Sequence, residues 1–253
     1  MKNHSETSKT VYYFGTCLAD MVYPQAGLCG IKLLQREGIR VIYPQQQTCC
    51  GQPAYNSGFP SEAKEVALAQ VRIFSGSSAP VIVPSGSCAG MMKYHYPALF
   101  QDDPEYFEVK NFSDRIYELT QYLNSVLHVR YQDKGPPIRL TWHSSCHALR
   151  EMECTEDSKA LIRQLENVEM VAVENEYECC GFGGTFSVKQ PEISAAMVHD
   201  KAEHLRETGT EKFLTGDCGC MMNINGHLEK QRSPMKGQHI AEFILERING
   251  SPK

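Results

Sequence analysis

The chain carries the same arrangement of cysteines twice. In each half, a single cysteine precedes an adjacent cysteine pair followed by glycine, and a further cysteine comes later. Corresponding cysteines of the two halves stand 129 or 130 positions apart. They are Cys17, Cys49, Cys50 and Cys88 in the first half and Cys146, Cys179, Cys180 and Cys218 in the second. A spacing repeated this closely indicates that one unit is present twice and that its thiols define it.

The length of the chain and the composition of its middle predict two domains. A chain of 253 residues suffices for two units, each of about 100–150 residues and each able to bury a core. We predict domains at 1–125 and 126–253, called copy one and copy two below. The predicted linker, 101–137, contains a predicted helix over 114–127 and ends in a rigid Gly-Pro-Pro sequence.

Alternating strand and helix patterns predict an α/β fold. The patterns follow one another in the same order in both halves, which favours two tandem, pseudo-repeated parallel βαβ (Rossmann-like) units. The predicted strands are 11–14, 39–43, 81–83, 138–142, 168–173 and 212–215, and the predicted helices are 26–37, 61–74, 156–166 and 192–207. Ligands of such sheets bind beyond the carboxyl ends of the strands. Each repeated cysteine follows a predicted strand, so we expect the thiols of each half to converge at the strand C-terminal ends.

Composition narrows the functional classes. Charged residues make up 22 % of the chain and the net charge is −5, so no basic face for general nucleic-acid binding is indicated. The first ten residues are polar, and no segment approaches the roughly 18 apolar residues of a membrane span. We therefore expect a cytoplasmic protein, able at most to dock peripherally on a membrane complex. The 11 cysteines are an odd number without a secretory signal, which argues against a disulfide framework.

Clustered thiols in a reducing compartment favour metal binding. Four converging thiolates suit either a tetrahedral zinc ion or a [4Fe–4S] cluster. The adjacent pair favours the cluster, because neighbouring thiolates fit poorly on one zinc ion but can reach different irons. Gly51 and Gly181 permit a tight turn after each pair. We predict one iron–sulfur cluster per half, with a zinc-binding structural scaffold as the alternative.

Copy two has one more cysteine near its end than copy one. Cys220 follows Cys218 after a single glycine, whereas the matching stretch of copy one contains only Cys88. The constant offset pairs Cys88 with Cys218, but a shifted alignment pairs it with Cys220, and the sequence allows both. Cys220 is therefore included among the predicted ligands.

Several other side chains have a structural interpretation beside a functional one. Cys29 and Cys154 lie outside the repeated spacing, and we expect both to serve packing. His143 and His147 flank Cys146 and suit either hydrogen bonding to a cluster or proton transfer, or a plain packing role. The two Met-Met pairs are expected in the core. No residue is identified as catalytic.

At these cysteines the chain resembles a known family. The pattern Cys-x₃₁-Cys-Cys-x₃₇-Cys, with glycine after the pair, is similar to the CCG cysteine-rich domain, which occurs twice in one component of heterodisulfide reductase and in the iron–sulfur subunit of glycolate oxidase. The resemblance covers 10–223, and the short two-repeat form is most similar to the lactate-utilisation members of the family. The family often ends its motif in Cys-x₂-Cys, from which both halves of this chain depart.

The resemblance implies a redox role. It implies an iron–sulfur electron-transfer subunit of a complex that oxidises L-lactate to pyruvate, with partner subunits that include a ferredoxin-like iron–sulfur protein. It also implies an alternative, cluster-based thiol–disulfide (heterodisulfide-type) reduction. The chain lacks the Gly-x-Gly-x-x-Gly fingerprint of flavin and nicotinamide sites, so we expect no stand-alone lactate oxidation.

Overall fold

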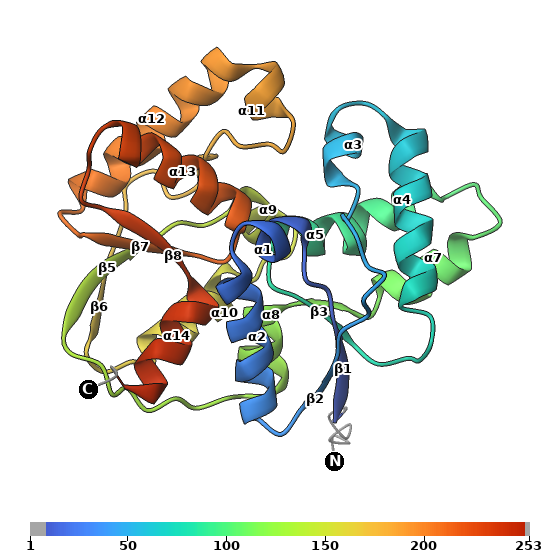
Figure 1. Cartoon of the computed structure of the whole chain (residues 1–253), viewed down its shortest axis with the longest axis horizontal. Helices are drawn as coiled ribbons and strands as arrows, with labels where there is room; N and C mark the ends of the chain where they lie inside the picture. The colour runs from blue at the N-terminus through green and yellow to red at the C-terminus, as the bar shows by residue number, and fades with distance from the viewer. Residues whose placement is uncertain (1–8, 251–253) are drawn as a thin grey trace.

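The protein contains two four-stranded parallel sheets with the same strand order (Figure 1). The computed structural model describes residues 9–250. Its strands are β1 (Thr10–Tyr13), β2 (Arg40–Ile42), β3 (Val81–Val83), β4 (Ile116–Glu118), β5 (Ile138–Trp142), β6 (Val168–Val171), β7 (Lys212–Thr215) and β8 (Lys236–His239). The orders β2-β1-β3-β4 and β6-β5-β7-β8 give each strand of copy one a counterpart in copy two. The predicted repeated α/β fold is confirmed.

Helices connect these strands, and several begin where the sequence provides a start signal. Proline occupies the first turn of three long connecting helices, as Pro24, Pro60 and Pro191, where its missing N–H costs no hydrogen bond. The helices are α1 (Cys17–Met21), α2 (Pro24–Arg36), α3 (Gln52–Asn56), α4 (Pro60–Ile73), α5 (Gly86–Gly90), α6 (Tyr96–Leu99), α7 (Tyr106–Ser113), α8 (Leu119–Gln121), α9 (Cys146–Arg150), α10 (Thr155–Arg163), α11 (Phe186–Lys189), α12 (Pro191–Glu207), α13 (Cys218–Lys230) and α14 (Ile240–Asn249). Two π-helical turns, η1 (Met91–His95) and η2 (Tyr122–Val126), follow α5 and α8.

The fourth strand of each sheet differs from the sequence prediction. The helix predicted over 114–127 is wrong at its start, because residues 116–118 form β4 in parallel register with β3. Helical structure begins only at Leu119. A three-residue strand is too short to show alternation. Its counterpart β8 has the sequence Lys-Gly-Gln-His and no apolar run, so backbone pairing with β7 decides its conformation.

The two sheets share an apolar core. Helix α2 packs against α14 from the other half of the chain. Leu33 and Leu34 of α2 belong to the same buried cluster as Phe243 and Ile244 of α14, and Trp142 of β5 completes it. The predicted boundary between 1–125 and 126–253 falls at the end of η2, and the independent folding of each half stays a prediction.

Two pairs of helices, each with one member from either half, pack against each other where the halves meet. Helix α5 of copy one packs against α9 of copy two, and α13 of copy two packs against α1 of copy one. At the first contact Gly86 lies so close to Ala148 that an added Cβ would be 2.7 Å from the Cβ of Ala148. At the second, Cys218 and Ala19 are buried in one cluster. These contacts bring the strand C-terminal edges of the two sheets face to face.

Within residues 9–250, no helix has both the length and the apolar character that crossing a bilayer requires. Most of the N-terminal segment that lacks a secretory pattern falls in residues 1–8, outside the described part of the chain.

Candidate metal centre

The four thiols of copy one come from three connections after β1, β2 and β3. Cys17 is the first residue of α1, and Cys88 is the third residue of α5. The Cys49-Cys50 pair follows β2, and Gly51 then adopts a left-handed conformation with φ 81° that starts α3. A side chain at that φ would be strained, which explains the glycine.

The cysteine pair links the four thiols of copy one into one group. The Sγ of Cys17 lies 3.9 Å from the Sγ of Cys49, and the Sγ of Cys50 lies 3.4 Å from the Sγ of Cys88. The backbone N–H of Gly51 donates to the Sγ of Cys49 at 3.4 Å. The two members of the pair therefore turn to different neighbours, as the prediction for a multi-iron cluster requires.

Hydrogen bonding concentrates negative charge on one member of the pair. The Cys17 thiol and then the Cys50 thiol donate to Cys49, which lowers the pKa of Cys49 to about 3. The same hydrogen bond from Cys17 to Cys49, together with burial, raises the pKa of Cys17. The N–H of Gly51 adds to the stabilisation of the Cys49 thiolate. The group thus stabilises thiolate, the form that binds metals.

Copy two repeats this group with its own residues. The Cys146 thiol and then the Cys180 thiol donate to Cys179 and lower its pKa to about 2. Gly181, with φ 76°, donates its N–H to the Sγ of Cys179 at 3.4 Å. Cys180 is also a hydrogen-bonding neighbour of Cys220, and burial raises the pKa of Cys220 overall.

The two candidates for the last thiol of copy two occupy different places. Cys220 is the third residue of α13, as Cys88 is the third residue of α5, and each exchanges a hydrogen bond with the second cysteine of its pair. Cys218 takes the place of Gly86 and packs in the cluster with Ala19 between the halves. The geometry supports the shifted alignment, in which Cys220 is the counterpart of Cys88.

The nine predicted ligands line one cavity between the two halves. This cavity has a volume of about 290 Å³ and lies where the strand C-terminal edges face each other. The nine cysteines are Cys17, Cys49, Cys50, Cys88, Cys146, Cys179, Cys180, Cys218 and Cys220. Phe182, Gly183 and Gly184 of copy two also line it, and Pro53 of copy one lies 3.6 Å from a Cβ built on Gly184. The two thiol groups are therefore neighbours.

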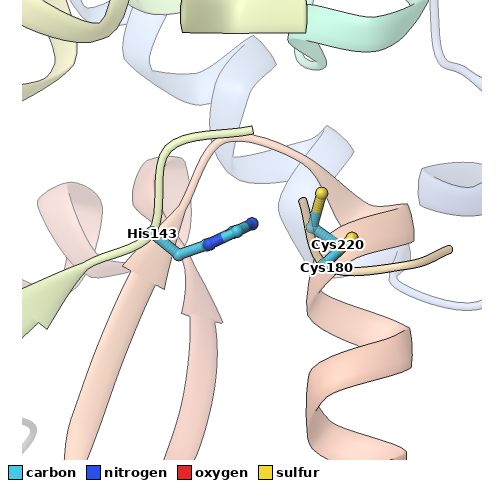
Figure 2. Close-up of side chains that lie close together, drawn as sticks. All are labelled: His143, Cys180 and Cys220. Atoms are coloured by element: carbon cyan, nitrogen blue, oxygen red, sulfur yellow. The ribbon is translucent and has the colours of Figure 1, made fainter. Parts of the chain in front are cut away.

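His143 is buried beside the copy-two thiols. Figure 2 shows its imidazole directed toward the sulfur atoms of Cys180 and Cys220. One ring nitrogen and the two sulfur atoms all lie within 4.8 Å of one another. His143 is 1 % exposed, and burial, followed by the nearby Lys201 ammonium, lowers its pKa to about 3. The imidazole is therefore neutral at pH 7.

His147 connects the cavity to a polar network that joins the halves. Its Nδ1 lies 3.3 Å from the Sγ of Cys146, and its Nε2 lies 3.1 Å from Nε2 of Gln52 in copy one. Glu151 lies 3.9 Å from His147 Nε2 and pairs with His95 at 3.0 Å. His147 therefore contacts both a predicted ligand and the opposite half.

Asp217 is a site residue that the sequence analysis missed. It is 4 % exposed, and its carboxylate accepts hydrogen bonds from the Ser85 hydroxyl at 3.0 Å and from the Ser87 N–H at 3.1 Å, both in copy one. Its other oxygen accepts from the Gly219 N–H at 3.1 Å. The only signal in the sequence was its place before a helix start, which is typical of a capping residue.

The cysteines outside the repeat lie away from the cavity lining. Cys29 is buried on α2 in the shared core, and Cys154 is fully buried at the start of α10. Met91, Met92 and Met221 are also buried, whereas Met222 is half-buried. These positions agree with the packing roles expected for them.

The donors present fit an iron–sulfur cluster in each half. Each half supplies four sulfur donors that the chain holds close together, and soft thiolates are the ligands that such clusters use. The cavity supplies space on the open side of both groups. Both cysteine pairs also receive a backbone N–H on one sulfur, a hydrogen bond of the kind that tunes ligand thiolates.

Comparison with known proteins identifies the cysteine-rich repeat. The CCG family, described as a cysteine-rich domain, matches residues 11–93 and 140–225. "Lactate utilization protein A" of Geobacillus sp. (strain WCH70) is 45 % identical over 94 % of this chain and 99 % of its own. The protein of the same name from Geobacillus thermodenitrificans (strain NG80-2) is 43 % identical over 94 % of this chain and 99 % of its own.

A solved structure shares the fold. A hypothetical protein from Helicobacter pylori matches with a TM-score of 0.69 at 12 % identity, over 97 % of this chain. This chain spans 50 % of the length of that protein. The likeness at this identity concerns the arrangement of the backbone alone.

Proposed function

Because the chain belongs to the CCG cysteine-rich domain family, we propose that it is an iron–sulfur electron-transfer subunit of a system that oxidises L-lactate to pyruvate. The relatives named for lactate utilisation, which match nearly the full chain, support this substrate. The resemblance to other members of the family supports the redox chemistry.

One observation carries the proposal: two equivalent groups of four thiols face one cavity. Cys17, Cys49, Cys50 and Cys88 would hold one cluster, and Cys146, Cys179, Cys180 and Cys220 the other. When bound, iron–sulfur clusters supply one-electron transfer. The shared cavity favours electron exchange between the two sites, because no intervening layer of the fold separates them.

The chain's own residues prepare the thiols for this role. Hydrogen bonds keep Cys49 and Cys179 as thiolates, and the turns at Gly51 and Gly181 present backbone N–H groups at the sulfurs. The chain offers no flavin or nicotinamide fingerprint that would accept a hydride. Partner subunits, among them a ferredoxin-like protein with a Cys-x₂-Cys-x₂-Cys-x₃-Cys-Pro run, would complete the two-electron oxidation.

Metal and sulfide analysis of anaerobically purified protein tests the proposal. We expect iron and acid-labile sulfide equivalent to about two clusters per chain, with a visible charge-transfer absorption and an EPR signal on reduction. Stoichiometric zinc without sulfide would contradict the proposal and favour a structural scaffold. We expect the isolated chain not to oxidise L-lactate with an artificial acceptor, and activity to appear on addition of partner subunits.

The shared cavity also favours a second candidate, cluster-based reduction of a disulfide. Such a reaction needs room for a small substrate beside the thiols, which the cavity of about 290 Å³ provides. Reduction of a small disulfide by the dithionite-reduced, cluster-loaded chain alone would support this candidate. Complete inertness toward disulfides under the same conditions would exclude it.

A further inference from the structure

The two halves differ at one buried position beside their thiols. The residue that follows the first strand of each sheet is Phe14 in copy one and His143 in copy two. Phe14 is fully buried in an apolar cluster with Cys50 and Cys88, and its ring lies 6.0 Å from the ring of Phe74. The same position in copy two therefore carries a polar ring, which is likewise buried beside the thiols.

The imidazole of His143 has no hydrogen-bond partner in the described residues. Both ring nitrogens are buried and unpaired, and the ring points at the sulfur atoms of Cys180 and Cys220 (Figure 2). A neutral imidazole carries one N–H donor, and leaving a buried donor unpaired costs about 1–3 kcal/mol. The sulfur atoms of Cys180 and Cys220 lie within 4.8 Å of a ring nitrogen and can accept from it once a group is bound there.

We propose that His143 is a positioning residue that donates an N–H hydrogen bond to the sulfur of the group bound in copy two, and that it gives this site a higher reduction potential than copy one. The proposal rests on the iron–sulfur function proposed above. Hydrogen bonds to cluster or ligand sulfurs stabilise the more negative, reduced state and so raise its potential. Phe14 offers no donor, so copy one lacks this contribution. An electron shared by the two sites then resides mainly on copy two.

Two charged side chains, Lys201 and Asp217, face the same site, and any test must distinguish their effects on the potential from that of His143. Lys201 is 1 % exposed, donates to the Asn175 carbonyl at 2.8 Å and lies close enough to influence Cys180. Gln70 occupies the matching buried position on α4. The Asp217 carboxylate contributes to raising the pKa of Cys146 and Cys220, whereas the Lys201 ammonium acts to lower the pKa of Cys220.

A redox titration of the full chain, followed by EPR, tests the proposal. In a Cys88→Ser background, which retains only the copy-two cluster, we expect His143→Phe to lower the potential and His143→Gln, which keeps an N–H donor, to restore part of the shift. In a Cys220→Ser background, Phe14→His should raise the potential of copy one. With His143, the EPR measurement should also detect a hyperfine coupling between the reduced cluster and a proton, and this coupling should disappear when the solvent is D₂O. It should be absent in His143→Phe. Lys201→Gln is the control for charge and should leave that coupling in place.

Each outcome bears on a different claim. If none of the proteins contains iron and sulfide, the proposed function itself fails. If clusters are present and neither His143→Phe nor Phe14→His shifts a potential, the role of His143 is refuted while the function stands. Loss of the copy-two cluster in both His143→Phe and His143→Gln would make the imidazole a ligand and would also overturn the hydrogen-bond role.

Discussion

Copy one and copy two share a sheet order and a group of four thiols, but they differ in what surrounds those thiols. Copy one places Phe14 and Gln70 around its cysteines, whereas copy two places His143 and Lys201 at the matching positions. Both sets are buried, so neither difference reflects exposure to solvent. The duplication therefore preserved the ligands and changed the polarity of their environment.

The same contrast appears at the contact between the halves. Gly86 of copy one is replaced in copy two by Cys218, which carries a buried thiol into the shared cavity. Reciprocal helix contacts at these positions hold the two thiol groups face to face. Different side chains at matching positions can make the two redox sites unequal although the fold of the two copies is the same. Substitutions at these positions can test this.

The largest expected effect concerns the last thiol of each site. Cys88→Ser and Cys220→Ser should each remove one cluster and halve the iron and sulfide content, because each eliminates one of four ligands. Cys218→Ser should retain both clusters, since Cys218 packs at the position of Gly86. Iron and sulfide analysis with EPR of anaerobic protein measures this. Loss of a cluster in Cys218→Ser, with retention in Cys220→Ser, would restore the constant-offset alignment.

The sequence could predict the repeated fold and the thiols but not this alignment. The offset of 130 residues holds for the cysteine pairs, yet copy two has two more residues between its pair and the end of its third strand. One of these two residues lies before α12 and the other between the start of α12 and the end of the strand, and no motif marks either. Spacing alone therefore pointed to Cys218 as readily as to Cys220.

Other features depended on tertiary packing. The shared cavity and the hydrogen bonds to Asp217 arise from the way the halves meet, which no local pattern encodes. Strand β8 forms because β7 offers a free edge for pairing, not because of its own propensity, and β4 is too short for its Ile-Tyr sequence to predict a strand. His143 was a candidate from its place near Cys146, but its direction toward the sulfurs needed the structure.

The fourth strand of each sheet, β4 in copy one and β8 in copy two, ends in a buried titratable residue. Glu118 and His239 stand in matching register and cap the following helices. Burial raises the pKa of Glu118 to about 7 from an ordinary value of 4.5, despite hydrogen bonds from Thr120 and Gln121. Burial lowers the pKa of His239. As pH rises, ionisation of Glu118 therefore lowers the free energy of unfolding, whereas deprotonation of His239 raises it.

For Glu118 the stabilisation is present below pH 4.5 and is lost as pH rises through about 7, because the folded state holds the proton more tightly. The full loss corresponds to about 3 kcal/mol. We expect Glu118→Gln to remove this pH dependence. The free energy of unfolding of the variant should therefore rise relative to that of the native chain between about pH 5 and pH 8. Urea unfolding at several pH values provides the measurement, with exposed Glu169→Gln as control. Parallel pH profiles for the native chain and Glu118→Gln would contradict the raised pKa.

A smaller effect is expected when the contact between the halves is made symmetric. Gly86→Cys would place a Cβ 2.7 Å from the Cβ of Ala148 and 3.0 Å from its Cα, so the backbone must shift. Overpacking of this kind costs about 2 kcal/mol in unfolding free energy. Cys218→Gly at the equivalent position creates space instead and should leave α5 undisturbed. Urea midpoints compare the two, and a Gly86→Cys chain as stable as the native one would show that α5 and α9 can separate freely.

The smallest expected effect separates packing thiols from ligand thiols. Cys29→Ala and Cys154→Ala each remove one buried sulfur from the apolar interior and should cost about 1 kcal/mol in unfolding free energy. Both should keep two clusters and unchanged potentials, because neither side chain lines the cavity. Cys50→Ser is the matched control: it is equally buried, yet its sulfur contacts Cys88 at 3.4 Å, and we expect it to lose the copy-one cluster. Loss of a cluster in Cys29→Ala with retention in Cys50→Ser would mean that the repeated spacing does not mark the ligands, and the equivalence of the two copies would have to be abandoned.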